Sequence, residues 1–360
     1  LITQAEISQR APADDVLRKL AHDHPRLGND VAVLRHIYDS STPAPTAAQA
    51  AAFDRHEGWF GDLARSFGKS DSAPIRVKAL AAARRTWITL TTAFLIVAAA
   101  CFVGLALFIT ALILLYLRKI RLRFARTRYL PEDRQPYLEA FTIYLVLLLV
   151  LPLFGARLGI GPPWAYVSLP VAFILGVIWP FVRPGGGRAA GAGGRWKAFC
   201  AAVGLHVGEG VFREIGAGII GYLAGLPLLV AGGALVMFLS KFAGFTPSHP
   251  IERHIPTGAS SVLLLFLLAS VYVPITEELM FRGALFGSLR RRTGFLFSAI
   301  VTALVFASVH PQGWPAIPAL AALAFTFASM REWRSSSIPS MTAHAINNAS
   351  LLAILLLALP

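Results

Sequence analysis

Charged residues are scarce in this chain. Asp, Glu, Lys and Arg make up 14% of its 360 residues, whereas roughly a quarter is typical of a soluble domain. Hydrophobic residues make up 56%, which excludes an ordinary soluble globule and indicates a membrane protein. Cysteine is nearly absent as well. Cys101 and Cys200 are too few for a disulfide framework or for a zinc site built from thiolates.

Acidic residues are less frequent than basic ones, and they are unevenly placed. Ten of the nineteen lie in residues 1–86, and no aspartate follows Asp133. The acids beyond Glu214 are Glu252, Glu277, Glu278 and Glu332. Among these, only Glu277 and Glu278 lie within a hydrophobic segment. A charge inside a bilayer is costly and usually functional, so this adjacent pair is the anomaly that has to be explained.

Basic residues give a net charge of +14, but their distribution excludes a nucleic-acid surface. They cluster in every second connection between apolar runs, which is how a multi-pass membrane protein is oriented. The basic connections are residues 118–128, 183–197, 288–292 and 331–334. The apolar runs are 86–117, 140–156, 164–182, 215–240, 258–280, 294–310, 315–330 and 337–360. At about twenty residues per span, the sequence predicts an all-α, polytopic bundle of about eight transmembrane helices, with cytoplasmic basic connections and the C-terminus outside.

Two segments outside the apolar runs have weaker patterns. Residues 1–85 combine mixed charge with helical apolar spacing, which predicts a small helical extension of unknown role. Its HDH motif at 22–24 is interpreted as a solvated helix end rather than a metal site. Residues 195–215 fit an amphipathic helix on the membrane surface, with His206 at the interface and not a ligand.

Within PITEELMFRG, the two glutamates face different surroundings. Glu278 and Arg282 are four residues apart and share a helix face, so the spacing predicts an intrahelical ion pair that faces the bundle interior. Glu277 points roughly 100° away on the helix and lacks that partner. The position of Glu277 in an apolar segment therefore requires another polar group nearby or a functional role.

Two later segments offer such polar groups. VFASVHPQGW contains Phe306 and His310, and MTAHAINNAS contains His344 and Asn348 on one helical face. At about 1.5 Å per helical residue, Glu277 and these side chains lie at overlapping depths below the cytoplasmic surface. We therefore expect a carboxylate, two imidazoles and a carboxamide to converge in one buried site.

Three short motifs resemble the signatures of a known family. EELMFR, FASVH and HAINN are similar to the EExxxR, FxxxH and HxxxN motifs of the CPBP intramembrane proteases. That family includes the CAAX prenyl endopeptidase and Abi-type proteins tied to bacteriocin immunity and processing. The resemblance covers residues 195–360 and implies a helical membrane domain there. Residues 86–190 would then be three transmembrane helices outside the match, preceded by the extension at 1–85.

The resemblance also implies roles for individual residues. Glu277 matches the catalytic glutamate, and His310 its partner in activating water. His344 and Asn348 match the pair that stabilises the oxyanion. The positions that match the supporting residues are Glu278, Arg282 and Phe306. The expected activity is an endopeptidase acting on membrane-associated or lipidated proteins, in the plasma membrane if the source is prokaryotic.

The sequence leaves two questions open. Glu277, His310 and His344 are legitimate zinc ligands, but there is no HExxH motif, and a metal-free mechanism is preferred over zinc. The alternatives to a protease are a non-catalytic membrane scaffold or immunity factor and, less favoured, a transporter that relays protons. The expected partners are the lipid bilayer and a membrane-bound peptide or protein, without nucleic acid.

Overall fold

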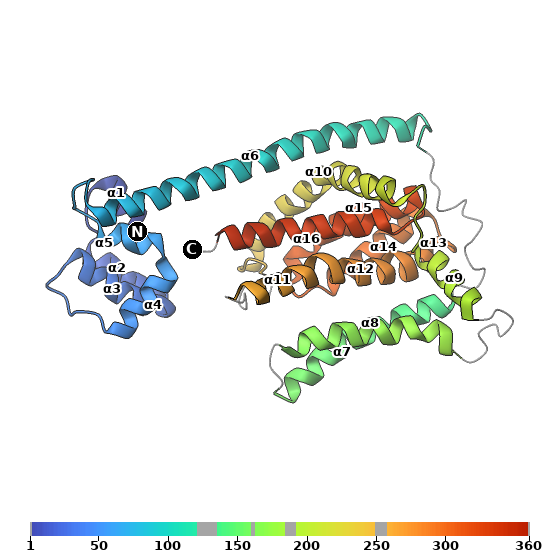
Figure 1. Ribbon diagram of the computed structural model, residues 1–360, viewed down its shortest axis with the longest axis horizontal. Helices are drawn as coiled ribbons and strands as arrows, with labels where there is room; N and C mark the ends of the chain where they lie inside the picture. The colour runs from blue at the N-terminus through green and yellow to red at the C-terminus, as the bar shows by residue number, and fades with distance from the viewer. Residues whose placement is uncertain (1, 121–134, 160–162, 184–191, 249–257, 359–360) are drawn as a thin grey trace. The chain divides into compact units, whose positions relative to one another are not determined.

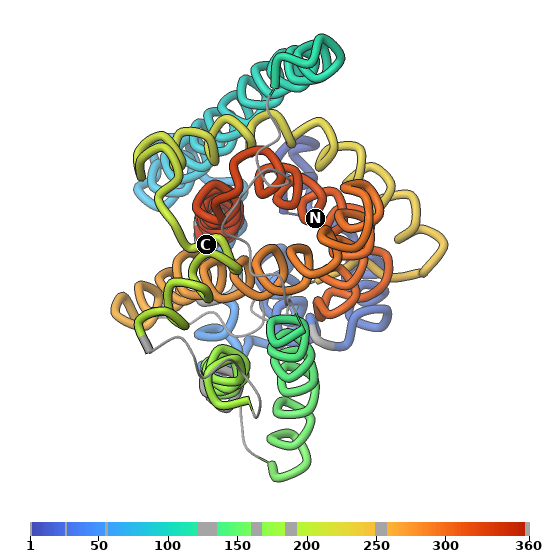
Figure 2. Tube along the Cα trace, turned by 90° about the vertical axis from the view of Figure 1, so that its right-hand side faces the viewer, coloured from blue at the N-terminus to red at the C-terminus, as the bar shows by residue number. Residues whose placement is uncertain are grey.

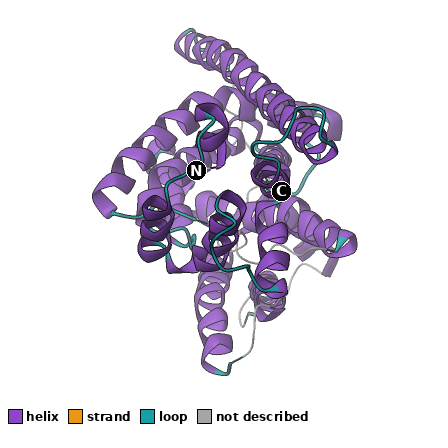
Figure 3. Cartoon of the chain, turned by 90° about the vertical axis from the view of Figure 1, so that its left-hand side faces the viewer, coloured by secondary structure: helices purple, strands orange, loops and turns teal. Residues whose placement is uncertain are grey.

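The secondary-structure elements that the structure describes are helices. The computed structural model describes all residues except 1, 121–134, 160–162, 184–191, 249–257 and 359–360, and no strand occurs among the described residues (Figure 3). The chain divides into two compact units, residues 1–98 with 356–360 and residues 99–355. The boundary near residue 98 lies inside one long helix, α6 (Pro74–Tyr116).

The first unit contains short amphipathic helices before α6. They are α1 (Ile2–Ser8), α2 (Asp14–Asp23), a 3-10 turn η1 (Pro25–Leu27), α3 (Gly28–Tyr38), α4 (Ala47–Glu57) and α5 (Trp59–Arg65). Their apolar faces form a core around Leu17, Leu34 and Phe53. His22 at the end of α2 is 90% exposed beside Asp23, as expected for a solvated helix end. The predicted helical character of this extension is confirmed.

The long helices of the second unit follow the predicted apolar runs, whereas the short helix α9 lies outside them. The helical elements of this unit after α6 are α7 (Gln135–Arg157), α8 (Pro163–Val182), α9 (Ala192–Val203), α10 (Val211–Ala243), α11 (Ala259–Leu267), η4 (Leu268–Tyr272), α12 (Val273–Glu278), η5 (Leu279–Phe286), α13 (Gly287–Arg290), α14 (Phe295–Ser308), the 3-10 turn η6 (Trp314–Ala316), α15 (Ile317–Arg334) and α16 (Ile338–Ala358). Elements α11 to α13 follow one another without a break, so the helix continues through the first part of the basic connection at 288–292.

Within the described residues, four helices are long and apolar enough to cross a membrane. They are α6, α7, α10 and the continuous helix Ala259–Arg290. Shorter apolar helices cover Ser168–Val182 and Phe295–Ser308. Large apolar side chains on the long helices are exposed, as lipid-facing residues are. The multi-pass helical architecture is confirmed, whereas the number of eight spans stays a prediction.

Pairs of long helices form the frame of the second unit. Helices α7 and α8 pack side by side, and α15 lies between α10 and α14 (Figure 1). Along α10, Gly225 and Gly232 face Thr326 and Ala319 of α15 so closely that neither position has room for a Cβ atom. Small residues at such positions let membrane helices approach and gain dispersion contacts. Figure 2 turns the chain by 90° and shows α16 nearly end-on, in red.

Ion pairs bring two of the predicted cytoplasmic connections to the same end of this unit. Arg290 binds Glu332 through two hydrogen bonds of 2.9 and 3.0 Å, which joins connection 288–292 to 331–334. This agrees with their common predicted side. Most of connection 118–128 and of connection 183–197 lies outside the described residues.

The prediction of one surface helix over residues 195–215 is wrong. Helix α9 ends at Val203, and α10 begins only at Val211. The connection between them contains three glycines, Gly204, Gly208 and Gly210, all with positive φ. Glycine adopts this backbone conformation without the steric penalty of other residues, and here it breaks the helix.

Candidate functional site

Both glutamates lie on a helix whose geometry changes twice. In the continuous helix Ala259–Arg290, the segments η4 and η5 are π-helical, and α12 between them carries Glu277 and Glu278. π-Helical turns have wider i→i+5 hydrogen bonding and occur often at functional sites. They also rotate the residues that follow, so side-chain directions cannot be read from an ideal α-helix over this stretch.

Glu278 is fully buried and is the hub of a charged cluster. Its Oε1 atom lies 2.9 Å from Nη1 of Arg282 and 3.0 Å from Nδ1 of His344. The predicted ion pair between Glu278 and Arg282 is therefore present, and the structure adds His344 from α16. An ionised carboxylate only accepts hydrogen bonds, so His344 donates from Nδ1 and keeps Nε2 for another partner.

Arg282 is fully buried as well, and aromatic rings enclose it. Its guanidinium lies 4.6 Å from the ring centroid of Phe306 and 4.9 Å from that of Phe327, and Nη2 donates to the carbonyl of Ala324 at 3.3 Å. A cation over an aromatic face is stabilised by the ring quadrupole, most strongly where water is excluded. The first motif thus contacts the second through Phe306.

Glu277 differs from its neighbour in having no strong partner. Its side chain is 14% exposed, and Oε2 lies 3.8 Å from Nε2 of His344, beyond hydrogen-bond distance. Within the described part of the chain, this buried oxygen has no hydrogen-bond partner. The two adjacent carboxylates therefore have separate surroundings: Glu278 is committed to Arg282 and His344, and Glu277 is available.

Two aromatic rings fix the orientation of His344. Its imidazole stacks on Phe327 with a centroid distance of 5.0 Å, and it meets Phe306 edge to face at 6.0 Å. The hydrogen bond to Glu278 fixes the remaining rotation. As a result, Nε2 of His344 is directed toward Glu277.

His310 lies just after the end of α14 and contacts the cluster through Phe306. Its Nδ1 is 2.6 Å from the carbonyl oxygen of Phe306, and the ring centroids are 4.3 Å apart. A carbonyl can only accept, so Nδ1 carries the proton and the neutral ring has its lone pair on Nε2. Among the described residues, His344 has a ring nitrogen within 4.0 Å of a carboxylate oxygen of Glu277, whereas His310 does not.

Asn348 lies one turn beyond His344 on α16 and binds the other π-helical segment. Its Nδ2 donates to the carbonyl of Ala269 in η4 at 2.9 Å, and its Oδ1 accepts from Asn347 at 3.2 Å. One N–H of the Asn348 amide is thereby used, and a second remains available in principle. The oxyanion role expected for Asn348 stays a prediction.

The site does not match a ready-made zinc centre. Over the described residues, no three His, Cys, Asp or Glu side chains form a group that could hold a metal ion. Glu277 and His344 are close together, but His310 does not complete a set of three with them. Catalytic zinc sites usually have three protein ligands, so we assign no step to a metal here.

Sequence reasoning missed two parts of this site. Phe327, which stacks on both Arg282 and His344, carries no local signal that separates it from the other apolar residues of α15. The bond between His344 and Glu278 joins residues 66 positions apart, and only the packing of α16 on α12 could show it.

Comparison with known proteins finds a family model that spans this cluster. Residues 259–350 match the family model for type II CAAX prenyl endopeptidase Rce1-like proteins. We call this stretch the Rce1-like domain. The matched stretch begins at α11 and includes Glu277, His310 and His344. The predicted resemblance to the CPBP family is confirmed for this part of the chain.

One curated relative adds to this match. "Putative membrane peptidase YdiL" of Bacillus subtilis (strain 168) is 34% identical over 68 residues, which cover 19% of this chain and 28% of the relative. The aligned part is thus less than a third of that relative. No solved structure matches the chain. The long apolar helices and these matches together support an integral, multi-pass membrane protein in which residues 259–350 resemble a peptidase family.

Proposed function

We propose that the Rce1-like domain is an intramembrane endopeptidase that uses Glu277 to activate water. The observation that carries the proposal is the unequal treatment of two adjacent carboxylates. Oε1 of Glu278 lies within 3.0 Å of both Arg282 and His344, whereas the contact of Glu277 with His344 is 3.8 Å long and its Oε2 has no hydrogen-bond partner among the described residues. A catalytic base has to be held in place without being neutralised by a permanent partner.

The chemistry of amide hydrolysis can be assigned to the residues of this site. Glu277 takes a proton from water, and the resulting hydroxide adds to the carbonyl carbon of the substrate. The tetrahedral oxyanion then collapses, the C–N bond breaks, and Glu277 returns the proton to the leaving amine. Glu277 thus accepts one proton from water and donates one proton to the leaving amine, so the carboxylate is regenerated.

Two groups on α16 are assigned to the oxyanion. His344, in a form protonated on Nε2, would donate from that atom, and Asn348 would donate from its uncommitted N–H. Preorganised donors of this kind stabilise the developing charge most strongly where water is excluded. The free Nε2 of His310 would orient the attacking water together with Glu277.

The proposed substrates are membrane-associated or lipidated proteins. The Rce1-like description names a CAAX prenyl endopeptidase, so a prenylated C-terminal peptide is the first class to test. If the source organism does not prenylate proteins, another membrane peptide takes its place. In either case the lipid bilayer is the partner that delivers the substrate.

The test is a comparison of wild type with Glu277→Gln in proteoliposomes. A library of transmembrane and lipidated peptides, including a farnesylated C-a-a-X peptide, is incubated with each protein, and the products are identified by mass spectrometry. We expect cleavage by wild type only, with both proteins equally folded and inserted. Cleavage by Glu277→Gln at the wild-type rate would refute the role of Glu277, and an inactive wild type would favour a scaffold.

A further inference from the structure

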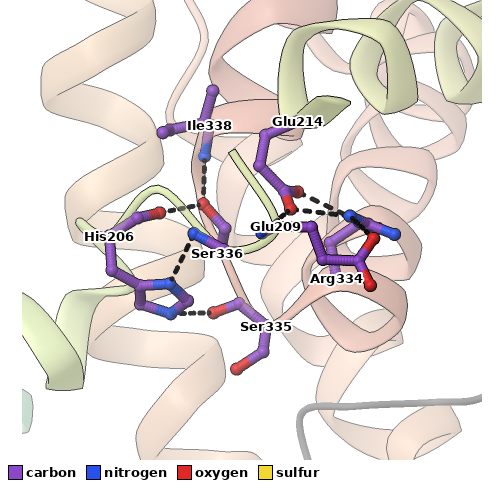
Figure 4. Close-up of polar contacts among 8 residues, drawn as sticks. His206, Glu209, Glu214, Arg334, Ser335, Ser336 and Ile338 are labelled. Carbon is purple, nitrogen blue, oxygen red and sulfur yellow. Dashed lines mark hydrogen bonds and ion pairs between the residues drawn. The ribbon is translucent and has the colours of Figure 1, made fainter. Parts of the chain in front are cut away.

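A second polar cluster lies where the connection between α9 and α10 meets the turn between α15 and α16 (Figure 4). Ser337 donates from its backbone N–H to the carbonyl of Gly204 at 2.8 Å and from its hydroxyl to that of Val203 at 2.7 Å. The hydroxyl of Ser336 donates to the carbonyl of His206 at 2.7 Å. We call these contacts between residues 203–208 and 335–337 the turn clasp.

The ring of His206 closes the clasp with both of its nitrogens. Nε2 lies 3.0 Å from the carbonyl oxygen of Ser335, and Nδ1 accepts from the N–H of Gly208 at 3.3 Å. Because a carbonyl only accepts, Nε2 must carry the proton. One neutral tautomer therefore satisfies both bonds, whereas a protonated ring would turn an N–H toward the N–H of Gly208.

Charged groups from two helices and the connection itself surround the clasp. Arg334 of α15 binds Glu214 of α10 at 2.7 and 3.0 Å and Glu209 of the connection at 2.9 Å. Arg331 donates to the carbonyl of Ala202 at 3.3 Å. Burial and the nearby Arg331 guanidinium lower the pKa of His206, against smaller opposite effects of its bond to Ser335 and of Glu214.

Two glycines leave no space for any other residue in the clasp. Gly204 has a φ of +75°, and a Cβ atom there would collide with the guanidinium of Arg331. Gly208 has a φ of +52°, and a Cβ there would collide with the carboxylate of Glu214. Both the backbone conformation and the lack of space therefore require glycine. The connection has one tightly packed arrangement.

The clasp touches elements that carry the candidate site. Val203 packs against Gly283, the residue after Arg282 in η5, so closely that Gly283 has no room for a Cβ. Ser336 accepts from the N–H of Ile338, the first residue of α16, at 3.2 Å. His344 follows within two turns of that start. Residues 203–214 thus lie outside the matched stretch but contact both of the helices that meet at Glu278.

We propose that His206 is a positioning residue, which in its neutral form holds the first turn of α16 and so keeps His344 in register with Glu278. The consequence is a pH dependence of the site that originates at a residue outside the three motifs. Protonation of His206 breaks the bond from Gly208, loosens the turn at 335–337, and lets His344 move. The activity part of this inference rests on the proposed function; the structural part does not.

The sign of the pH effect follows from the lowered pKa. The folded state favours neutral His206, so the stabilisation by the clasp is fully present above the ordinary histidine pKa of about 6.5 and is lost as the pH falls through the lower pKa of His206 in the folded protein. A non-titrating variant at position 206 isolates the contribution of His206 to the pH dependence.

The experiment compares full-length wild type, His206→Gln and His206→Ala in lipid nanodiscs. The Nε2 of Gln replaces the ring Nε2 as donor to Ser335 but does not titrate, whereas Ala loses both bonds. Hydrogen–deuterium exchange of residues 335–345 is measured from pH 5 to 8 and corrected for the intrinsic rate. We expect roughly 10-fold faster exchange for Ala at pH 7.5, near-wild-type exchange for Gln, and an acid-induced increase in wild type only.

Peptide cleavage provides the second measurement. We expect kcat of His206→Ala to be roughly 10-fold lower than that of wild type, with little change in KM. As the pH falls, the cleavage rate of wild type should decrease more steeply than that of His206→Gln. Unchanged exchange at 335–345 in Ala, or the same pH dependence in wild type and Gln, would overturn the proposal. If Ala does not fold, the comparison with Gln still decides it. If wild type cleaves nothing, the proposed function fails while the exchange data still test the clasp.

Discussion

Two clusters, one around Glu278 and one around Glu214, each bring an arginine, a glutamate and a histidine close together. They differ in how completely their polar atoms are hydrogen-bonded. In the cluster around Glu214, both carboxylate oxygens accept hydrogen bonds from Arg334, and Oε1 accepts a further one from the backbone N–H of Glu209. In the cluster around Glu278, by contrast, Oε2 of Glu278 and Nε of Arg282 have no hydrogen-bond partner among the described residues. Native proteins rarely leave buried polar atoms unpaired, so such atoms need an explanation. A saturated cluster holds helices together, and an unsaturated one has capacity for water or substrate.

The largest expected difference between the two clusters is in cleavage, which should depend on the proton acceptor Glu277. Glu277→Gln keeps the shape of the side chain but cannot take a proton from water, so we expect cleavage to fall by roughly 10²- to 10⁴-fold. The measurement is kcat/KM in proteoliposomes at pH 7.5, with folded yield determined by size-exclusion chromatography. A variant that retains more than a tenth of the activity would remove Glu277 from the mechanism.

The next largest expected effect is a loss of folded-state stability when either buried arginine is replaced. Arg334→Met leaves Glu214 buried without its partner, and Arg282→Met does the same to Glu278; each should cost about 3–5 kcal/mol of folded-state stability. Thermal unfolding in detergent measures this loss. The matched controls are the double variants Arg334→Met/Glu214→Gln and Arg282→Met/Glu278→Gln, which should recover part of the loss because no carboxylate remains unpaired.

A smaller effect separates two serines of the same helix. Ser288 donates to the carbonyl of Ala284 at 2.6 Å, whereas the hydroxyl of the buried Ser270 has no partner among the described residues. Ser288→Ala should therefore cost about 1 kcal/mol, and Ser270→Ala should be neutral or stabilising. Thermal unfolding of both variants tests this difference. A clear loss of stability in Ser270→Ala would show that its hydroxyl is satisfied, for example by water.

The smallest expected effect is that of chelators. Because Glu277, His310 and His344 do not form a three-ligand group, we expect strong chelators to leave the cleavage rate within about 2-fold of the untreated enzyme. Elemental analysis of the active protein accompanies the assay. One zinc per chain that is lost in Glu277→Ala would contradict the expectation and restore a metal to the mechanism.

Local patterns were sufficient for the helices and for one contact of the site. Apolar runs give the positions of the long helices because burial in lipid depends on composition along one segment. The spacing of four gives the pair Glu278–Arg282, which survives the π-helical geometry of η5. Helix ends were less predictable: α6 begins at Pro74 rather than near residue 86, since its first turns are amphipathic and not apolar.

Contacts between distant segments were beyond the sequence. The expected approach of His310 to Glu277 rested on depth and on the family resemblance, and neither gives the rotation of a side chain around a helix axis. In the structure, His344 takes the position beside Glu277. The break at residues 204–210 escaped detection because amphipathic spacing continues across it, although three glycines in seven residues were a signal against a continuous helix.

The full burial of Arg282 and Glu278 has a consequence for biogenesis. While the ribosome synthesises the helix Ala259–Arg290, the groups that satisfy its charges do not yet exist. The carbonyl of Ala324 lies 42 residues further along the chain than Arg282, and His344 lies 66 residues beyond Glu278. Until α15 and α16 have been synthesised, this helix therefore either stays at the insertion machinery or relies on the Glu278–Arg282 ion pair alone. Truncations or substitutions in α16 should then appear in cells first as failed assembly and degradation of the whole domain, before any loss of enzymatic rate can be seen.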